Sequence, residues 1–185
     1  MPSELVIKII GVIGFASALL SVAFQEILPW VTFQQEYLLI NPATKVWEWV
    51  YFEISPFLIR YQFESGVARI EWFYKMDSTL IGAMCLAGTA VGLIGVLKKS
   101  RIMNLIGGTL VFASLPAFGT SLPGIYPYIA WSSGAKMAIF GSIMLLASAS
   151  IGYVKDHREK ERLSLKNLKE AWESDQSACS DKSFK

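Results

Sequence analysis

Few residues in this sequence belong to the types that usually carry chemistry. It contains one histidine, His157, and two cysteines, Cys85 and Cys179. A zinc or copper site, a haem with two histidine ligands or a histidine-based catalytic pair needs several such ligands close together. Cys85 lies in an apolar run and Cys179 in a polar tail, so the spacing does not indicate a disulfide framework. We therefore expect no catalytic residue, no metal site and no bound cofactor.

Motifs for other chemistry are equally scarce. The sequence contains neither a GxSxG nucleophile elbow nor a phosphate-binding loop. The net charge is only +2, and no block of lysine and arginine is interleaved with aromatic residues. Such a block would be expected for a partner made of nucleic acid. The sequence thus predicts a protein that is not an enzyme and does not bind nucleic acid.

Composition instead indicates a membrane protein, because 53% of the residues are hydrophobic and only 17% are charged. A helix that crosses a bilayer needs about 20 apolar residues. Four such runs occur, over residues 5–24, 79–97, 102–122 and 129–154. We expect an all-α bundle of four helices whose first partner is the lipid bilayer.

The distribution of charge in the connecting segments predicts the orientation of these spans. The link "KKSR" (98–101) and the start of the tail, "KDHREKER" (155–162), are rich in basic residues, which are typical of cytoplasmic segments. Residues 26–77 carry four Lys/Arg against seven Asp/Glu, and the link 123–128 has no charge. We expect a multi-pass protein of the cell membrane with both termini in the cytoplasm and residues 26–77 outside.

Glycines are frequent in the predicted spans. Gly88 and Gly92 form a GxxxG pair, and small residues of this kind let membrane helices approach closely. One interpretation is packing within the bundle, and the other is a lateral face for a second chain. No acidic residue lies deep in any span, which argues against a proton or ion path.

The predicted external segment has the period-two pattern of a β-hairpin. Apolar and polar residues alternate in 57–63 and again in 67–75, and Ser65-Gly66 between them is typical of a two-residue turn. That turn predicts a register in which Arg60 lies opposite Glu71, a favourable pair of opposite charges. A slip by one residue would place Arg60 beside Ile70 instead.

Residues 46–54 form a candidate third strand. Their alternation would place Val50, Phe52 and Ile54 on one face and the aromatic residues Trp47, Trp49 and Tyr51 on the other. The alternative is a helix lying at the membrane interface. In either case the recurring charges argue against a membrane span.

Two stretches resemble the first extracellular segment of the claudin family. "LPWVTF" (28–33) is similar to the claudin LP-x-W-x-V-T stretch, and "VWEWVYFEI" (46–54) is similar to its W-x-x-L-W stretch. The four spans, the long first external segment and the short second one also agree, over about residues 5–155. The resemblance, which extends to the related peripheral-myelin-protein group, implies a small extracellular antiparallel β-sheet above a left-handed four-helix bundle.

The resemblance also implies roles for individual residues. Trp30 looks like the tryptophan that seats the claudin sheet against the bilayer, Trp47 like the first tryptophan of the second motif, and Trp49 or Tyr51 like its later aromatic residue. The sequence departs from claudins because its external segment has no cysteine pair and its tail ends in "KSFK". The acidic residues Glu48, Glu53 and Glu64 could line a claudin-like pore or lie on a solvated face of the sheet. We favour the solvated face.

The tail after the fourth span is expected to begin as a helix. Leu165, Leu168 and Trp172 recur at helical spacing, and the charges over 155–172 favour helical ion pairs. It is either a solvated continuation of the fourth span or a helix that docks on a membrane surface or a partner. We expect disorder in the last dozen residues. The chain is thus predicted to have a membrane domain over 1–155, followed by a cytoplasmic helix and a disordered tail over 156–185.

These observations lead to three functional hypotheses. The first is a claudin-like protein of cell adhesion or self-assembly, which contacts other proteins or forms a homo-oligomer through its extracellular sheet. The second is an accessory structural subunit of a larger membrane complex, for example a respiratory one. The third is a pore, although no span shows a polar stripe. The candidate contact residues are Trp30, Trp47, Trp49, Tyr51, Arg60, Glu71, Gly88 and Gly92.

Overall fold

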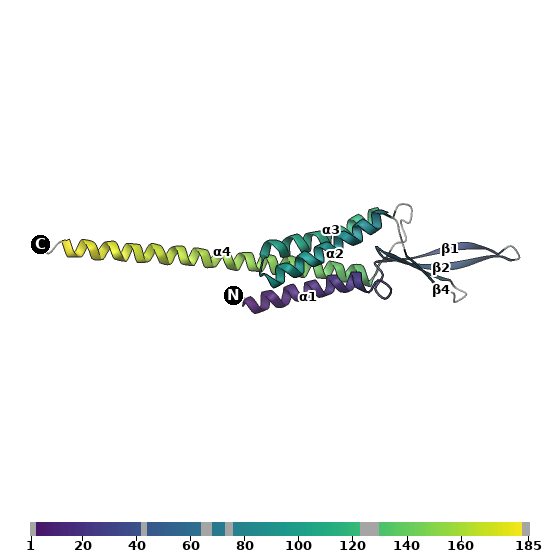
Figure 1. The fold of residues 1–185 in the computed structure, drawn as a ribbon, viewed down its shortest axis with the longest axis horizontal. Coiled ribbons are helices and arrows are strands. Elements are labelled where there is room, and N and C mark those ends of the chain that lie inside the picture. The colour runs from purple at the N-terminus through teal and green to yellow at the C-terminus, as the bar shows by residue number, and fades with distance from the viewer. Residues whose placement is uncertain (1–2, 42–43, 64–67, 73–75, 123–129, 183–185) are drawn as a thin grey trace.

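Four helices form a bundle with a small sheet at one end and a long helical tail at the other (Figure 1). The computed structural model describes residues 3–41, 44–63, 68–72, 76–122 and 130–182. The helices are α1 (Glu4–Ala23), α2 (Met76–Leu97), α3 (Arg101–Thr120) and α4 (Ser133–Lys182). All four are long and apolar enough to cross a membrane, and they lie at about the positions of the four predicted spans.

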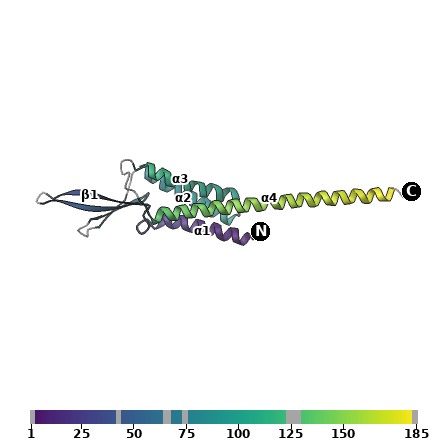
Figure 2. The ribbon, with the colours of Figure 1, turned by 180° about the vertical axis from the view of Figure 1, so that it is seen from behind.

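The fourth helix differs from the prediction at both ends. It begins at Ser133, because Ala130–Trp131 form a short strand, β5, where the sequence analysis starts the span. It is a single helix of 50 residues, about 75 Å long at the usual rise per residue. The tail is therefore a continuation of the fourth span, and it stays helical to Lys182 where disorder is expected (Figure 2).

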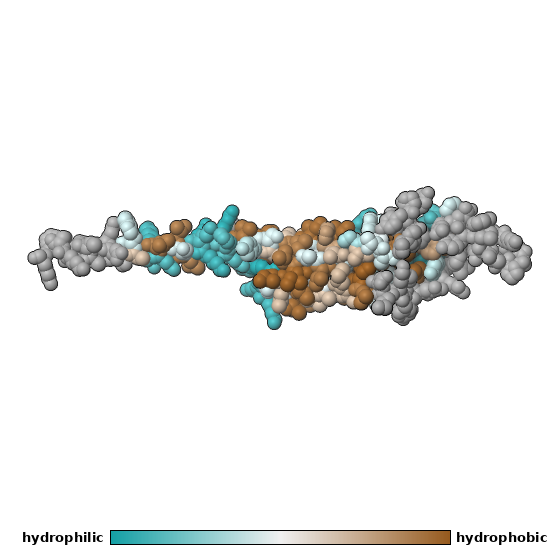
Figure 3. All heavy atoms as spheres, turned by 90° about the horizontal axis from the view of Figure 1, so that it is seen from above, coloured by the Kyte–Doolittle hydropathy of each residue, from teal (hydrophilic) through white to brown (hydrophobic). Residues whose placement is uncertain are grey.

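The hydropathy of the surface differs between the bundle and the tail helix. Hydrophobic surface gathers over the bundle, and hydrophilic surface covers the adjoining part of α4 where it leaves the bundle (Figure 3). The bundle is consequently the part of the chain whose surface suits a lipid environment.

The link between α2 and α3 is short and well defined. Lys99 adopts a left-handed backbone conformation, with φ of 55°, and the N–H of Ser100 donates to the C=O of Gly95 at 2.8 Å. This is the hydrogen bond of a Schellman cap, which ends a helix sharply. The Ser100 hydroxyl then accepts from the N–H of Met103 and caps α3.

The sheet has five antiparallel strands in the order β4-β3-β2-β1-β5. Besides β5, the strands are β1 (Val31–Asn41), β2 (Thr44–Ile54), β3 (Leu58–Phe63) and β4 (Ala68–Trp72). The predicted third strand is confirmed as β2, and the alternative of an interfacial helix is wrong. The strand β1 was not predicted.

The predicted register of the β3–β4 hairpin is wrong by one residue. The structure pairs Arg60 with Ile70, and Ile59 with Glu71, so that Glu71 does not lie opposite Arg60. Arg60 instead lies opposite Glu53 of β2, with 3.4 Å between Nη1 and Oε2. The charge partner that the sequence analysis assigned to β4 is thus supplied by the central strand. The predicted turn itself, at Ser65-Gly66, lies outside the described residues.

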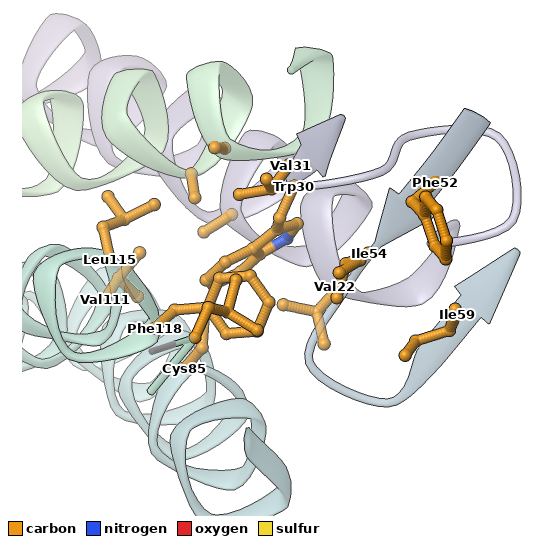
Figure 4. Packing of buried hydrophobic residues seen from close by; sticks show 14 of the residues in the cluster. Val22, Trp30, Val31, Phe52, Ile54, Ile59, Cys85, Val111, Leu115 and Phe118 are labelled. Carbon is orange, nitrogen blue, oxygen red and sulfur yellow. The ribbon is translucent and has the colours of Figure 1, made fainter. Parts of the chain in front are cut away.

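The hydrophobic core continues from the bundle into the base of the sheet. Trp30 and Phe118 lie at its centre, with Val22 of α1 and Ile54 of β2 beside them (Figure 4). Since β1 follows α1 through this cluster and β5 precedes α4, the sheet is attached to the bundle by packed side chains as well as by the chain itself.

Candidate contact surface

Trp30 joins the sheet to the bundle and is fully buried. Its indole N–H donates to the C=O of Ser21 in α1 at 2.9 Å, and its ring meets that of Phe118 edge-on at 5.4 Å. Its backbone accepts from the N–H of Ser132 at 2.9 Å and donates to the C=O of Ile54 at 3.1 Å. The side chain therefore positions the sheet against the helices, and it is not available to a partner.

Gly134, in the first turn of α4, allows the chain at Trp30 to approach this closely. A Cβ there would overlap the C=O of Leu28. The N–H of Gly134 donates to the C=O of Pro29 at 2.9 Å. The start of α4 is thereby held against the entry to β1.

A second polar contact connects the end of α1 to the turn between β2 and β3. The buried Gln25 donates through Nε2 to the C=O of Val22, and its Oε1 accepts from the N–H of Phe57 at 3.0 Å. A cavity of about 220 Å³ lies beside it, between the end of α1 and Phe57 and Leu58. Gln25 and Trp30 each connect α1 to the base of the sheet, and together they restrict how the sheet can tilt on the bundle.

The two faces of β2 differ as predicted. Val50, Phe52 and Ile54 are buried, whereas Trp49 is 43% exposed and Tyr51 is 50% exposed. Trp47 belongs to the same alternating set as Trp49 by its position in β2, but its side chain lies outside the described residues. The exposed face near the bundle thus presents two aromatic side chains beside the Glu53–Arg60 ion pair.

Among the described residues, only a short strand pairs with the outer edge of β1. The strand has 11 residues, and β5 pairs only with Val31 and Thr32, which leaves nine residues from Phe33 to Asn41. No strand among the described residues pairs with these nine on that side. Their backbone N–H and C=O groups on this edge form a template that another strand can pair with.

The two edges of the sheet differ in the features that protect an edge from pairing. Lysine, proline, inward charges and short length are the usual protective features. The edge strand β4 has only five residues, two of which are Arg69 and Glu71. The open part of β1 has no lysine and no proline, and Glu36 is its single charge. Thus β1 is the edge better suited to pairing.

Gly88 and Gly92 lie against other helices of the same bundle. A Cβ at Gly88 would meet the C=O of Gly107 in α3, and one at Gly92 would meet the side chain of Leu145 in α4. This is the role in bundle packing that the sequence analysis offered as the first of two interpretations, and it leaves these two positions unsuited to a second chain.

An ionic cluster at the tail end of the bundle was missed by the sequence analysis. Oε1 of Glu4 accepts from Arg101 Nη2 at 2.8 Å and from Lys155 Nζ at 2.8 Å. Arg101 also reaches Asp156, with 3.4 Å between Nε and Oδ2. The signal was present in the sequence, because three of the predicted spans have charged residues at the ends that a four-helix bundle brings together.

Below this cluster a buried polar group joins three helices. Nδ2 of Asn104 donates to the hydroxyl of Ser148 at 3.3 Å, and that hydroxyl donates to the C=O of Ile7 at 3.0 Å. Asn104 Oδ1 lies against Gly95 of α2, and the described residues offer it no hydrogen bond. These side chains explain how polar residues are accommodated inside an otherwise apolar bundle.

Within the described residues, no three His, Cys, Asp or Glu side chains are grouped as metal ligands. A scan against models of known protein families finds no match, and a search of curated proteins finds none either. The candidate site is thus defined by geometry alone: an exposed aromatic face and an open strand edge, held on four apolar helices by Trp30.

Proposed function

We propose that this chain is a non-enzymatic protein of the cell membrane that makes protein–protein contacts, first with further copies of itself, through an extracellular sheet. The observation that carries the proposal is the outer edge of β1 from Phe33 to Asn41, with which no strand of the described residues pairs. Addition of a strand to an open edge is a common mode of protein recognition, because the backbone groups themselves provide the hydrogen bonds. The exposed Trp49 and Tyr51 add apolar contact area on the neighbouring strand.

The membrane restricts how two copies can use this edge. Copies in one membrane have the same direction relative to the bilayer, so their β1 strands would pair in parallel. Parallel pairing in register would place Glu36 beside its own counterpart, and like charges in that position are destabilising. Copies in two facing membranes present β1 in opposite directions. Antiparallel pairing centred on Tyr37 would place Glu36 opposite Leu38, so the proposed contact is between facing membranes.

The resemblance to claudins supports the same proposal without adding residues to it. The claudin-like plan is a sheet raised above four spans, and the orientation predicted from the basic segments, with both termini in the cytoplasm, would put the sheet outside. Because residues 26–77 contain no cysteine, no disulfide within this segment stabilises the sheet.

Two adjacent glutamines provide a matched test. The C=O of Trp30 accepts from Ser132 on the β5 side, and backbone groups alternate between the two edges of a strand. The N–H of Gln34 therefore faces the open edge, whereas that of Gln35 faces β2. Proline is tolerated where the N–H has no partner in the sheet and disrupts a strand where it has one.

The experiment compares Gln34→Pro and Gln35→Pro in vesicles that contain the purified protein. We expect Gln34→Pro to keep the fold and to abolish adhesion between vesicles, and Gln35→Pro to destabilise the sheet. Gln34→Lys, which adds a charge at an exposed position without changing the backbone, serves as a second variant. Adhesion that persists in both Gln34 variants would refute contact through this edge.

A second candidate function is that of an accessory subunit of a larger membrane complex. It is favoured by the exposed apolar residues of the tail helix, since Leu165, Leu168 and Trp172 are each about two-thirds exposed. Purification in mild detergent distinguishes the two. Stoichiometric co-purification of other membrane subunits would support the accessory role, and recovery of the chain with copies of itself alone would support self-contact.

A further inference from the structure

We propose that a groove between α3 and α4, at the tail end of the bundle, binds one anionic phospholipid. Its phosphate would lie at Arg101 and one acyl chain would run along the groove toward the middle of the bilayer. This site is separate from the sheet, and it requires only that the bundle crosses a membrane.

The groove has the size and the polarity of a lipid site. Its volume is about 420 Å³, within the range of several hundred Å³ that is usual for small-molecule sites. Its apolar lining is Ile102 and Leu105 of α3 and Ala149, Tyr153 and Val154 of α4, and Arg101 is its charged member. Since Arg101 is the first residue of α3, the charge lies at the tail end and the apolar lining continues into the bundle.

Arg101 is held in place and still has donors to offer. A guanidinium group has five N–H donors, and the contacts with Glu4 and Asp156 use Nη2 and Nε. A Cβ at Gly152 would overlap the Arg101 side chain, so the absence of one lets this side chain lie against α4. A group that is already positioned loses little freedom on binding, which favours affinity.

The excess of positive charge at this end indicates an anionic headgroup. Glu4 and Asp156 balance Arg101 and Lys155. Lys98 and Lys99, directly before the N-cap of α3, are both exposed and form no ion pair with any residue that the structure describes. Lysines beside a membrane surface attract anionic lipids.

The surroundings of the groove argue for a lipid rather than a protein. Ile102, Leu105 and Tyr153 are 49–70% exposed on the apolar surface of the bundle, where acyl chains would be the surrounding solvent. Soluble phosphate would use the charges but not the apolar lining, which supplies five of the groove's seven residues, beside Arg101 and Ser150. The combination of a cationic end and an apolar trough matches a phospholipid.

The test is native mass spectrometry of the full chain, released from vesicles that contain equal amounts of phosphatidylglycerol and phosphatidylcholine. We expect one phosphatidylglycerol to be retained in preference to phosphatidylcholine. The double variant Lys98→Gln/Lys99→Gln should reduce that preference by about fivefold for each charge removed. Its control is Lys160→Gln/Arg162→Gln, which removes the same charge from the exposed tail helix and should leave the preference unchanged.

A second pair of variants tests the apolar trough. Leu105→Trp should displace the lipid, whereas Ile106→Trp should not, because Leu105 lines the groove and Ile106 does not. The side chains of Leu105 and Ile106 are 49% and 47% exposed, so both variants should fold. Equal retention of the two lipids, or equal effects of the paired variants, would overturn the proposal. Displacement by soluble glycerol phosphate would also overturn it, since the trough would then be irrelevant.

Discussion

The indole N–H of Trp30 donates to the backbone C=O of Ser21 at 2.9 Å, and through this bond the first residue of the sheet region is tied to the last turns of α1. Both residues are fully buried. A buried carbonyl that loses its donor costs about 1–3 kcal/mol. This bond is thus one of the buried contacts that set the position of the sheet relative to the helices.

We predict that Trp30→Phe lowers the free energy of unfolding by about 1–3 kcal/mol, because Phe keeps an aromatic ring but cannot donate the hydrogen bond. Thermal unfolding in detergent measures this loss. The control is Trp131→Phe, a neighbouring position whose side chain is 40% exposed, for which we expect little change. Equal stability of the two variants would mean that the bond to Ser21 does not hold the sheet.

We predict that Gly95→Ala destabilises the bundle by about 1–3 kcal/mol, the usual cost of overpacking. The added Cβ would overlap Asn104 Oδ1 and lie 2.7 Å from its backbone nitrogen, so α2 and α3 must separate. The measurement is again thermal unfolding, with Ala87→Ser as a control that adds one heavy atom at an exposed site on α2. An unchanged Gly95→Ala variant would show that the two helices do not pack as closely as described.

We predict that Glu4→Gln weakens the attachment of α1 at the tail end, since Glu4 accepts from both Arg101 and Lys155. Because the Glu4 side chain is 40% exposed, we expect a loss of no more than about 1 kcal/mol. The loss should shrink as salt is raised, since exposed charges are screened. Unfolding at low and high salt measures this, with Glu173→Gln on the tail helix as control. A loss that does not depend on salt would argue against an electrostatic role.

The sequence alone predicts the elements whose pattern is dictated by a uniform environment. Four apolar runs correspond to four helices, since any helix that can cross a bilayer needs a run of about 20 apolar residues. The strand β2 was predictable because Val50, Phe52 and Ile54 face the core and alternate with exposed residues. In both cases the surroundings impose a simple period on the chain.

Features that depend on two distant segments were not predictable in this way. The alternation in β1 breaks at Gln34 and Gln35, and its outer half extends beyond the helices, where no core requires a strict pattern (Figure 1). The predicted β3–β4 register rests on a two-residue turn at Ser65-Gly66 and is favoured by the Arg60–Glu71 pair, whereas in the structure it is β2 that places an acidic residue, Glu53, opposite Arg60. Five residues separate the paired Gln62 and Ala68, an odd number that a two-residue turn does not allow.

The candidate contact surface also has residues that one segment of sequence predicts and features that only the folded chain shows. Trp49 and Tyr51 were identified by their residue type and their alternation along one strand, and both are exposed. Trp30 was identified by resemblance, and only the structure shows its burial and its hydrogen bond to Ser21. The open edge of β1 follows from the order of strands in the sheet, which no single segment specifies.

The most direct test of the central claim is hydrogen exchange resolved to single amides of β1. We predict that the amides of Gln34 and Glu36 exchange freely when the protein is dispersed in detergent and become protected when vesicles adhere. The amide of Gln35, which faces β2, should be protected in both states. If the amides of Gln34 and Glu36 exchange equally fast in adhering vesicles and in detergent, the contact is not made through the edge of β1.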